Sequence, residues 1–227
     1  MPPFLAGPSL TGDTWVWQAR KGDVEVRFTG RGPVLDREET LRALTPAAPP
    51  LAWARQVHSA VALPARPGAC GEGDALYTAA AGLALSVATA DCVPVVIAGP
   101  AGLAAVHAGW RGIAGGVVQA ALAEMQGQPD QWTAWVGPAI GVCCYEVGED
   151  VAERVVTASG AEIATSGPAG RPHLDLPGAV RRQLEKAGVG EVIVLPRCTR
   201  CDADRLWSYR REGKRAGRNL AFIWRAA

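Results

Sequence analysis

Histidine is scarce in this chain, which has only three in 227 residues: His58, His107 and His173. Because imidazole is the usual copper ligand, three histidines are too few for a multicopper oxidase with a trinuclear centre. They leave room for at most one mononuclear metal site. This scarcity excludes one class of metalloenzyme before any motif is considered.

An excess of charge of one sign and a long apolar run are also lacking. The formal net charge of +1 argues against a general binder of nucleic acids or membrane surfaces. The longest apolar stretch, Val93 to Val106, is broken by Gly99-Pro100 and is too short to span a bilayer. The first residues, MPPFLAGPSLTGDTW, lack the basic region of a secretory signal. We therefore expect a soluble, cytoplasmic protein.

Cysteine is present but not dense. Six cysteines in a chain of this length do not make a disulfide scaffold, and two of them, Cys143 and Cys144, are adjacent. We expect free thiols in a reducing compartment.

Cys198 and Cys201 form a Cys-x-x-Cys pair, with His173 and Asp175 upstream. This faintly resembles the zinc deaminase pattern H-x-E…P-C-x-x-C, but Asp175 is one methylene shorter than glutamate and the proline is displaced by one residue. A redox-active pair is the other alternative, although no thioredoxin-like βαβ unit precedes it.

A basic, aromatic segment runs from Arg197 to Arg218 and includes Trp207 and Tyr209. Such a stretch can grip phosphates and stack bases. Since the whole chain is nearly neutral, we interpret most of these charges as a solvated face and expect no nucleic-acid partner.

Strand and helix signals are mixed along the chain. Apolar runs and alternation predict strands at Val24–Thr29, Leu83–Thr89, Val93–Ala98, Leu103–His107, Trp132–Val136, Val192–Leu195 and Leu220–Trp224. Apolar spacing and capping residues predict helices at Asp36–Leu44, Gly112–Met125, Glu149–Thr157 and Pro177–Ala187. Because there is no clean βαβ alternation, we expect an α+β fold with mixed sheets rather than a Rossmann fold.

Three side chains with metal-ligating chemistry stand where a strand gives way to a loop: His58, Cys92 and His107. Two imidazoles and one thiolate suit Zn²⁺ and leave a fourth position for water, as in a catalytic site. Their separations of 34 and 15 residues are not a compact ligand signature. The alternative is core or surface histidines, with a buried thiol beside a capping Asp91.

The segment HAGWRG (107–112) joins a strand end to a helix through two glycines and an arginine. Backbone N–H groups after Gly109, together with Arg111, make a natural anion site. The alternative is a glycine turn with a buried histidine and a packing tryptophan. The segment is neither a Walker loop nor a GxGxxG motif.

Six motifs occur in order: RQVHSA (55–60), GDALYT (73–78), TADCVP (89–94), HAGWRG (107–112), GPAIGVCCYEVGEDV (137–151) and CTRCDADRLWSYRREGKRAGR (198–218). Together they resemble the YfiH or laccase-domain family, also called peptidoglycan editing factors, from about Trp53 to the C-terminus. The resemblance implies one domain over residues 1–227. It implies an α/β sandwich around mixed β-sheets, in a CNF/YfiH-like cysteine-hydrolase superfamily.

The resemblance also implies a single zinc site formed by His58, Cys92 and His107. Members of the family act on purine nucleosides, by phosphorolysis of adenosine, inosine, guanosine or methylthioadenosine and by deamination of adenosine. The expected partners are therefore a purine nucleoside and phosphate. The sequence does not rank the two reactions.

Within this resemblance, we expect Arg111 and the N–H groups after Gly109 to hold phosphate. Asp91 is the nearest candidate for a proton carrier, and Arg31 in RFTGRG (27–32) is a candidate substrate-binding residue. Residues 1–50 are shorter than the corresponding region of the family, because 33–35 lead directly into the predicted helix. If the missing stretch forms a wall of the pocket, the substrate range is expected to differ.

Two other classes of function stay open at this point. In a metal-free cysteine hydrolase, Cys92 is the nucleophile and His58 or His107 is its base. A non-catalytic peptidoglycan-editing module would keep its role without His107. No membrane partner is expected, and a monomer is compatible with the sequence, which leaves the oligomeric state open.

Overall fold

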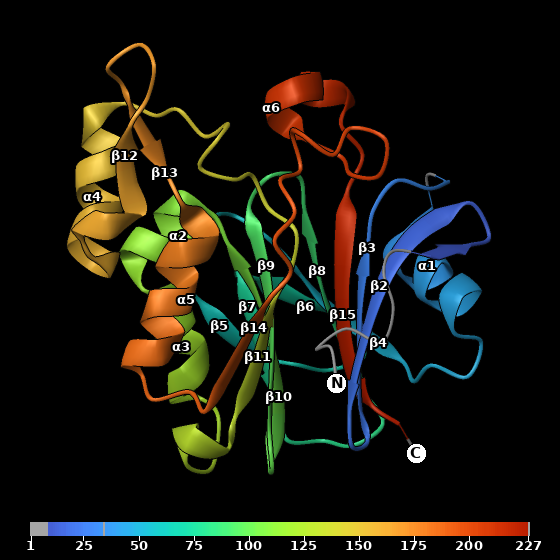
Figure 1. Cartoon of the computed structure of the whole chain (residues 1–227). Helices are drawn as coiled ribbons and strands as arrows, with labels where there is room; N and C mark the ends of the chain where they lie inside the picture. Colours follow the sequence, from blue (N-terminus) through green and yellow to red (C-terminus); the bar gives the residue numbers. More distant parts are fainter. Residues whose placement is uncertain (1–8, 34, 227) are drawn as a thin grey trace.

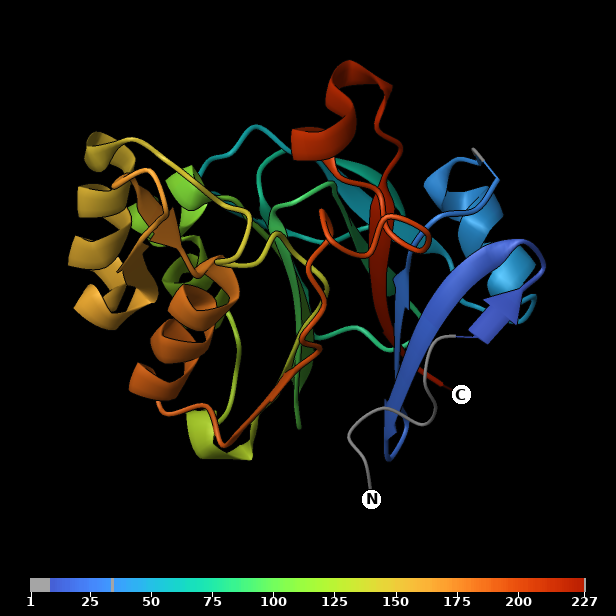
Figure 2. The same cartoon turned by 45° about the horizontal axis from the view of Figure 1, so that its top comes forward.

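Two large β-sheets lie face to face at the centre of the molecule, with helices on both outer sides (Figures 1 and 2). The computed structural model describes residues 9–33 and 35–226. The expected α/β sandwich with mixed sheets is confirmed, whereas its place in a cysteine-hydrolase superfamily and the extent of the domain stay predictions. The secretory-signal argument rests partly on residues 1–8, and the predicted shortening of the N-terminal region involves residue 34; residues 1–8 and 34 lie outside the described residues. The shortening stays a prediction.

The first sheet has seven strands, in the order β1 (Ser9–Thr11), β2 (Thr14–Lys21), β3 (Val24–Thr29), β15 (Asn219–Arg225), β8 (Ala84–Thr89), β4 (Leu51–Arg55) and β6 (Gly68–Glu72). β4 is parallel to both of its neighbours, and the other pairs are antiparallel. Helix α1 (Arg37–Leu44) covers the outer face, where Leu41 packs with Phe222 and Trp224. A capping box between Asp36 and Glu39 starts this helix.

The second sheet has six strands, in the order β14 (Glu191–Val194), β11 (Thr133–Val136), β9 (Val93–Gly99), β10 (Gly102–Ala108), β7 (Ala75–Thr78) and β5 (Ala62–Pro64). Its outer face carries the helices α2 (Trp110–Gly115), α3 (Val117–Ala123), α4 (Glu149–Ser159) and α5 (Leu176–Lys186). A small sheet pairs β12 (Ala164–Ser166) with β13 (Pro172–Leu174). Short helical turns lie at Pro129–Gln131, Ala161–Ile163, α6 (Tyr209–Glu212) and Gly213–Arg215.

Side-chain alternation along β10 explains how the layers stack. Leu103 and Ala105 lie in the core between the sheets, whereas Ala104 and Val106 lie in the core beneath the helices. Successive side chains of a strand point to opposite faces, so a strand that is apolar at every position is buried on both. The apolar stretch 93–106 is thus a pair of covered strands. Within the described ranges, no helix combines the length and the apolar character needed to cross a bilayer.

The predicted elements agree with the structure to within one or two residues at their ends, with one correction. The predicted helix Gly112–Met125 is wrong as a single element. Gly116 has a φ of 86°, in the left-handed region, and it ends α2 before α3 begins. Several short or edge strands, such as β1, β5 and β6, have no predicted counterpart because their sequences are rich in polar residues, proline or glycine.

Candidate functional site

The topology of the sheets brings His58, Cys92 and His107 to one edge of the sandwich. β4 and β8 are parallel neighbours, so the chain leaves both strands at the same edge. His58 lies in the loop after β4 and Cys92 in the loop after β8. β9 and β10 are antiparallel, and their register sets His107 opposite Pro94, two residues beyond Cys92. Residues far apart in the chain therefore meet because of strand pairing.

The three side chains form a compact group that can hold a metal ion. Each offers a ligand atom, and these atoms lie within 4.8 Å of one another. The distance from His58 Nε2 to Cys92 Sγ is 3.9 Å, and the two imidazole centroids are 4.9 Å apart. A His₂Cys donor set at this spacing fits a divalent cation that prefers nitrogen and sulfur ligands, with one coordination position left over.

Asp74 is the buried centre around which this group is organised. Its carboxylate accepts hydrogen bonds from the backbone N–H groups of Val57, His58 and Ser59, at 3.2, 3.0 and 2.6 Å, and from the Ser59 hydroxyl at 2.8 Å. The same carboxylate lies 2.7 Å from Nδ1 of His107. Nε2 is thus the nitrogen of His107 left for a ligand, an arrangement that metal-binding histidines commonly show.

Sequence reasoning assigned no role to Asp74. The signal was present in GDALYT (73–78), where an isolated acidic residue directly precedes a buried apolar strand. A carboxylate in that position must have partners, because burying it alone costs several kcal/mol or more. What the sequence could not show is that those partners are the His58 loop and the His107 ring.

The electrostatics of the group favour a charged thiolate. Burial raises the pKa of Cys92, but hydrogen bonds with His107 and His58 outweigh it and bring the pKa to about 7. Burial lowers the pKa of His107, but the contacts with Asp74 and Cys92 raise it to about 9. Burial raises the pKa of Asp74, yet hydrogen bonds from His107 and Ser59 hold it below its ordinary value. Thiolate is the form of cysteine that ligates metals or attacks electrophiles.

Two residues at the site have a left-handed backbone although neither is glycine: His58, a member of the group, with a φ of 60°, and Asp91, which precedes Cys92, with a φ of 92°. Such conformations persist where surrounding contacts impose them. The Asp91 carbonyl accepts from the Ile140 N–H at 2.9 Å. Its carboxylate accepts from the Thr199 hydroxyl and the Arg210 backbone N–H, each at 2.6 Å. These bonds hold the Cys92 loop, and the proton-carrying role of Asp91 stays a prediction.

The backbone of Gly109 lies close to two members of the group, His58 and Cys92. A Cβ atom at this position would lie 2.9 Å from Cδ2 of His58 and 3.1 Å from Sγ of Cys92. The predicted importance of Gly109 therefore has a steric basis, since any side chain would push the two candidate ligands apart. Its predicted contact with phosphate stays a prediction.

A cavity of about 730 Å³ opens over the group. Its wall includes the arginines Arg37, Arg55, Arg111, Arg210 and Arg218 and the aromatic residues Trp110, Tyr145 and Tyr209. Among the described residues, Asp91 is the only acidic one that lines it. A cavity lined by this excess of cations concentrates anions.

The arginines reach the cavity from separate parts of the fold. Arg37 comes from α1, and burial, followed by the nearby charge of Arg218, lowers its pKa to about 10. Arg111 follows the strand end at β10, and its guanidinium lies 4.4 Å from the ring centroid of Trp110. The structure therefore places the predicted Arg111 in the cavity wall. Because α1 contributes Arg37, the helix that follows residues 33–35 borders the cavity.

Arg31 is not among the residues that line the cavity. Its guanidinium lies 4.0 Å from the ring centroid of Trp207, donates to the carbonyl of Ala203 and forms an ion pair with Glu212. These contacts tie Arg31 to the segment after Cys201. The predicted contact between Arg31 and substrate stays a prediction, and the position of Arg31 does not support it.

His173 does not join Cys198 and Cys201, which contradicts the deaminase-like alternative. Nδ1 of His173 lies 2.7 Å from the Val142 carbonyl. Among the described residues, the candidate metal group that contains the Cys-x-x-Cys pair is completed by two other cysteines and no histidine. The spacing along the chain could not reveal this because the partners come from a different loop.

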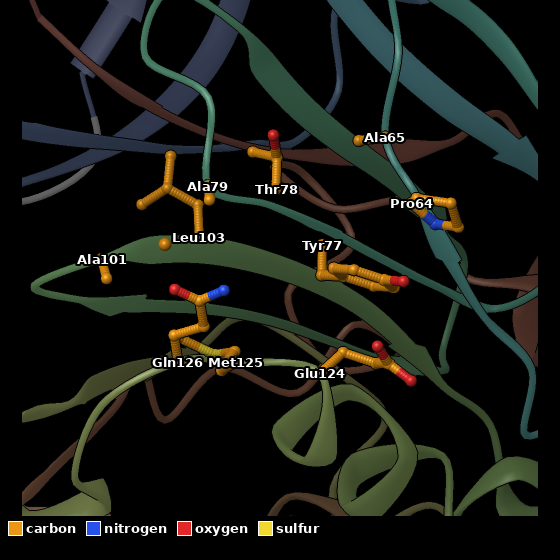
Figure 3. A pocket seen from close by; sticks show the side chains of 11 residues that line it. Pro64, Ala65, Tyr77, Thr78, Ala79, Ala101, Leu103, Glu124, Met125 and Gln126 are labelled. Atoms are coloured by element: carbon orange, nitrogen blue, oxygen red, sulfur yellow. The ribbon is translucent and has the colours of Figure 1, made fainter.

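A separate cavity of about 190 Å³ shares no lining residue with the first (Figure 3). Tyr77 and Glu124 lie on its wall, beside Pro64 and Met125, and no histidine or cysteine lines it. The two candidate metal-binding groups of the described structure therefore lie elsewhere, and the cavity over His58 is the candidate functional site.

The fold and the site define a class of protein: a two-sheet α/β sandwich with a His–Cys–His group at the base of an arginine-lined cavity. The family model described as multi-copper polyphenol oxidoreductase laccase matches residues 34–226, and the chain belongs to this family. The donor set does not fit the multi-copper part of that description. Only two histidines of the chain meet, which is too few for a trinuclear copper centre.

Curated relatives carry names from nucleoside metabolism. The chain is 42% identical over 193 residues to the purine nucleoside phosphorylase of Deinococcus radiodurans, covering 83% of this chain and 75% of the relative. It is 36% identical over 177 residues to the purine nucleoside phosphorylase YfiH of Escherichia coli, covering 76% and 72%. It is 40% identical over 162 residues to adenosine deaminase RL5 of an unknown prokaryotic organism, covering 67% and 62%.

Solved structures confirm the fold. The Neisseria meningitidis protein NMB0706 superimposes with a TM-score of 0.85 at 30% identity, covering 93% of this chain and 99% of that protein. The hypothetical protein YfiH of Bacillus licheniformis gives a TM-score of 0.82 at 25% identity, covering 96% and 98%. The predicted membership of the YfiH or laccase-domain family is thus confirmed.

Proposed function

We propose that this chain is a zinc-dependent purine nucleoside enzyme whose main reaction is phosphorolysis, with adenosine deamination as a second activity. The observation that carries the proposal is the presence of the His58–Cys92–His107 group and five arginines on one cavity. The names of the curated relatives supply the substrate class, a purine nucleoside.

The zinc ligands in this proposal are His58, Cys92 and His107, with Asp74 holding the His107 ring in position. When bound, zinc supplies Lewis acidity and can lower the pKa of a bound water. The lowered pKa of Cys92 keeps the thiol ready for ligation near neutral pH.

The arginines favour phosphorolysis over deamination. In phosphorolysis, the bond between ribose C1′ and the purine nitrogen breaks, an oxygen of phosphate bonds to C1′, and the leaving base takes up a proton. Deamination uses water and needs no anion site. Arg111, Arg37 and Arg218 line the cavity and can donate charge-assisted hydrogen bonds to a phosphate dianion. The aromatic residues Trp110, Tyr145 and Tyr209 offer surfaces against which a purine can pack.

The test is incubation of zinc-loaded protein with adenosine, with and without phosphate, and separation of the products by chromatography. We expect adenine and ribose-1-phosphate to appear only when phosphate is present. Inosine that forms faster than adenine when phosphate is present would make deamination the main reaction. No turnover of adenosine, inosine, guanosine or methylthioadenosine would refute the proposal.

A second candidate is a metal-free cysteine hydrolase, favoured by the pKa of about 7 for Cys92 and its distance of 3.9 Å from His58 Nε2. A chelator-treated enzyme that stays active and loses its activity when an electrophile labels Cys92 would support this candidate. Loss of activity on chelation and recovery with zinc would support the first.

A further inference from the structure

Four cysteine side chains from two separate loops meet away from the cavity. Cys143 and Cys144 lie in the loop after β11, and Cys198 and Cys201 lie in the loop after β14. Their sulfur atoms all lie within 4.8 Å of one another, and all four thiols are free. We call these residues the four-cysteine cluster.

Strand pairing explains why the two loops meet. β11 and β14 are parallel neighbours, so the chain leaves both at the same edge. The contact continues beyond the strands as an isolated parallel bridge between Ala139 and Cys198. The Thr199 N–H donates to the Ala139 carbonyl at 3.0 Å, and the Ala139 N–H donates to the Arg197 carbonyl at 3.2 Å. The backbone therefore fixes the cysteines before any ligand binds.

The spacing of the sulfurs matches tetrahedral coordination. With zinc–sulfur bonds of about 2.3 Å, neighbouring sulfurs of a tetrahedral site lie roughly 3.8 Å apart. Sγ of Cys201 lies 3.7 Å from Sγ of Cys143 and 3.4 Å from Sγ of Cys144. A sulfur that is this close to two others is what a shared ion requires, whereas a disulfide would use only one of the two contacts.

Two neighbouring groups would stabilise the negative charge of thiolates bound to a metal ion. The backbone N–H of Gly141 donates to Sγ of Cys198 at 3.3 Å. The guanidinium of Arg211 donates to the carbonyls of Thr199 and Arg200, at 2.7 and 2.8 Å, which places a positive charge against the loop between Cys198 and Cys201. Four thiolates around a divalent cation keep a net negative charge, which a neighbouring N–H dipole and a guanidinium stabilise.

We propose that Cys143, Cys144, Cys198 and Cys201 form a second metal site, a closed tetrathiolate site for zinc that is distinct from the His58–Cys92–His107 group. Four protein ligands leave no open coordination position, so the site is structural. It joins the loop that carries Ile140 and Tyr145 to the segment that carries Tyr209 and Arg210, and all four of these residues line the cavity.

The proposed site also connects to the candidate catalytic loop through one side chain. Thr199 lies between Cys198 and Cys201, and its hydroxyl donates to Asp91 at 2.6 Å, next to Cys92. Metal bound to the four-cysteine cluster would therefore stabilise the wall of the cavity without touching the substrate. This inference does not depend on the proposed enzymatic reaction.

The experiment is metal analysis of protein purified from zinc-supplemented cells under reducing conditions. We expect two zinc ions per wild-type chain, one in Cys201→Ser and one in Cys92→Ser. Cys70→Ser is the matched control and should keep both ions, because Cys70 belongs to neither group. An unchanged zinc content in Cys201→Ser and in Cys143→Ser would overturn the proposal.

Wild-type protein provides a test that does not depend on the folding of a variant. Native mass spectrometry should show two bound metal ions, and cobalt substitution should give thiolate-to-cobalt charge-transfer absorption that persists in Cys92→Ser. A single bound ion in zinc-saturated wild-type protein that is lost in Cys92→Ser would overturn the proposal. The mass of the denatured, unreduced protein gives a further test. Each disulfide lowers this mass by two hydrogens, and finding one or more disulfides within the cluster would also overturn the proposal.

Discussion

Within the described part of the chain, two groups of side chains could each hold a metal ion, and they differ in composition and surroundings. The His58–Cys92–His107 group lies on an arginine-lined cavity, offers three ligands, and has the buried carboxylate of Asp74 behind it. The four-cysteine cluster offers four thiols, two of them on exposed residues, and it lies outside the cavity lining. Ligand number and the adjoining space, rather than the presence of cysteine, separate a site suited to catalysis from one suited to structure.

Removing one ligand from each group should give the sharpest contrast. We expect Cys92→Ala to reduce nucleoside turnover to background, because it removes a ligand at the cavity floor. We expect Cys201→Ser to lower the thermal midpoint while keeping measurable turnover. Activity assays and thermal unfolding of both variants, with Cys70→Ala as control, measure this. Equal loss of activity with no change in stability would remove the distinction.

The carboxylate behind His107 should matter next. We expect Asp74→Asn to weaken zinc binding and activity by roughly 10–100-fold, the usual cost of losing a partner of a metal-binding histidine. Chelator competition and steady-state kinetics give the two values. Asp202→Asn is the control, because Asp202 pairs with Arg205 at 3.1 Å outside the cavity. Full activity in Asp74→Asn would contradict the role assigned to the carboxylate.

The arginines that line the cavity give it an anion-binding capacity that we expect to test through Arg111. We expect Arg111→Gln to raise the KM for phosphate by about tenfold or more, since a charge-assisted hydrogen bond contributes roughly 1.5–3 kcal/mol. Deamination of adenosine should change much less. Varying the phosphate concentration at fixed nucleoside measures the effect, and Arg181→Gln on the exposed face of α5 is the control. An unchanged KM would place the phosphate elsewhere.

Gly109 lies against the His58–Cys92–His107 group and Gly141 against the four-cysteine cluster, and we expect the two positions to differ in how well they tolerate a methyl group. A Cβ at Gly109 would lie 2.9 Å from His58, whereas a Cβ at Gly141 would lie 3.3 Å from Cys198. We expect Gly109→Ala to cost about 1–3 kcal/mol, as overpacking usually does, and to reduce metal binding, with a smaller effect for Gly141→Ala. Denaturant unfolding and metal titration compare them; a larger loss for Gly141→Ala would reverse the expected order.

Metal-free protein should show the smallest but most direct contrast, in the pH dependence of alkylation. The pKa is about 7 for Cys92 and is raised to about 11 for Cys201, chiefly by its hydrogen bond with Cys144. Only thiolate reacts, so alkylation of Cys92 should rise with pH and level off above about 7, while that of Cys201 should still be rising at pH 9. Mass spectrometry of peptides follows both. Identical profiles would contradict the environments described.

Several features of the site could be predicted from residues alone. His58, Cys92 and His107 can be predicted because each is a residue type that ligates metals at the end of a predicted strand, and the structure brings the three together. Arg31 fits a motif but lies against Trp207, because a sequence motif does not say which way a guanidinium points. The role of Asp74 could not be predicted, because its partners include backbone N–H groups of a loop 15 to 17 residues away in the chain.

The sequence by itself determined the local elements and the chemical inventory. Alternation, capping residues and glycines act over a few residues, so strands such as Val24–Thr29 and the helix after Asp36 could be predicted from their neighbours. Only the tertiary structure decided which elements pair. The parallel alignments of β4 with β8 and of β11 with β14 gather the ligand groups, and they depend on contacts between segments far apart in the chain, which no local pattern encodes.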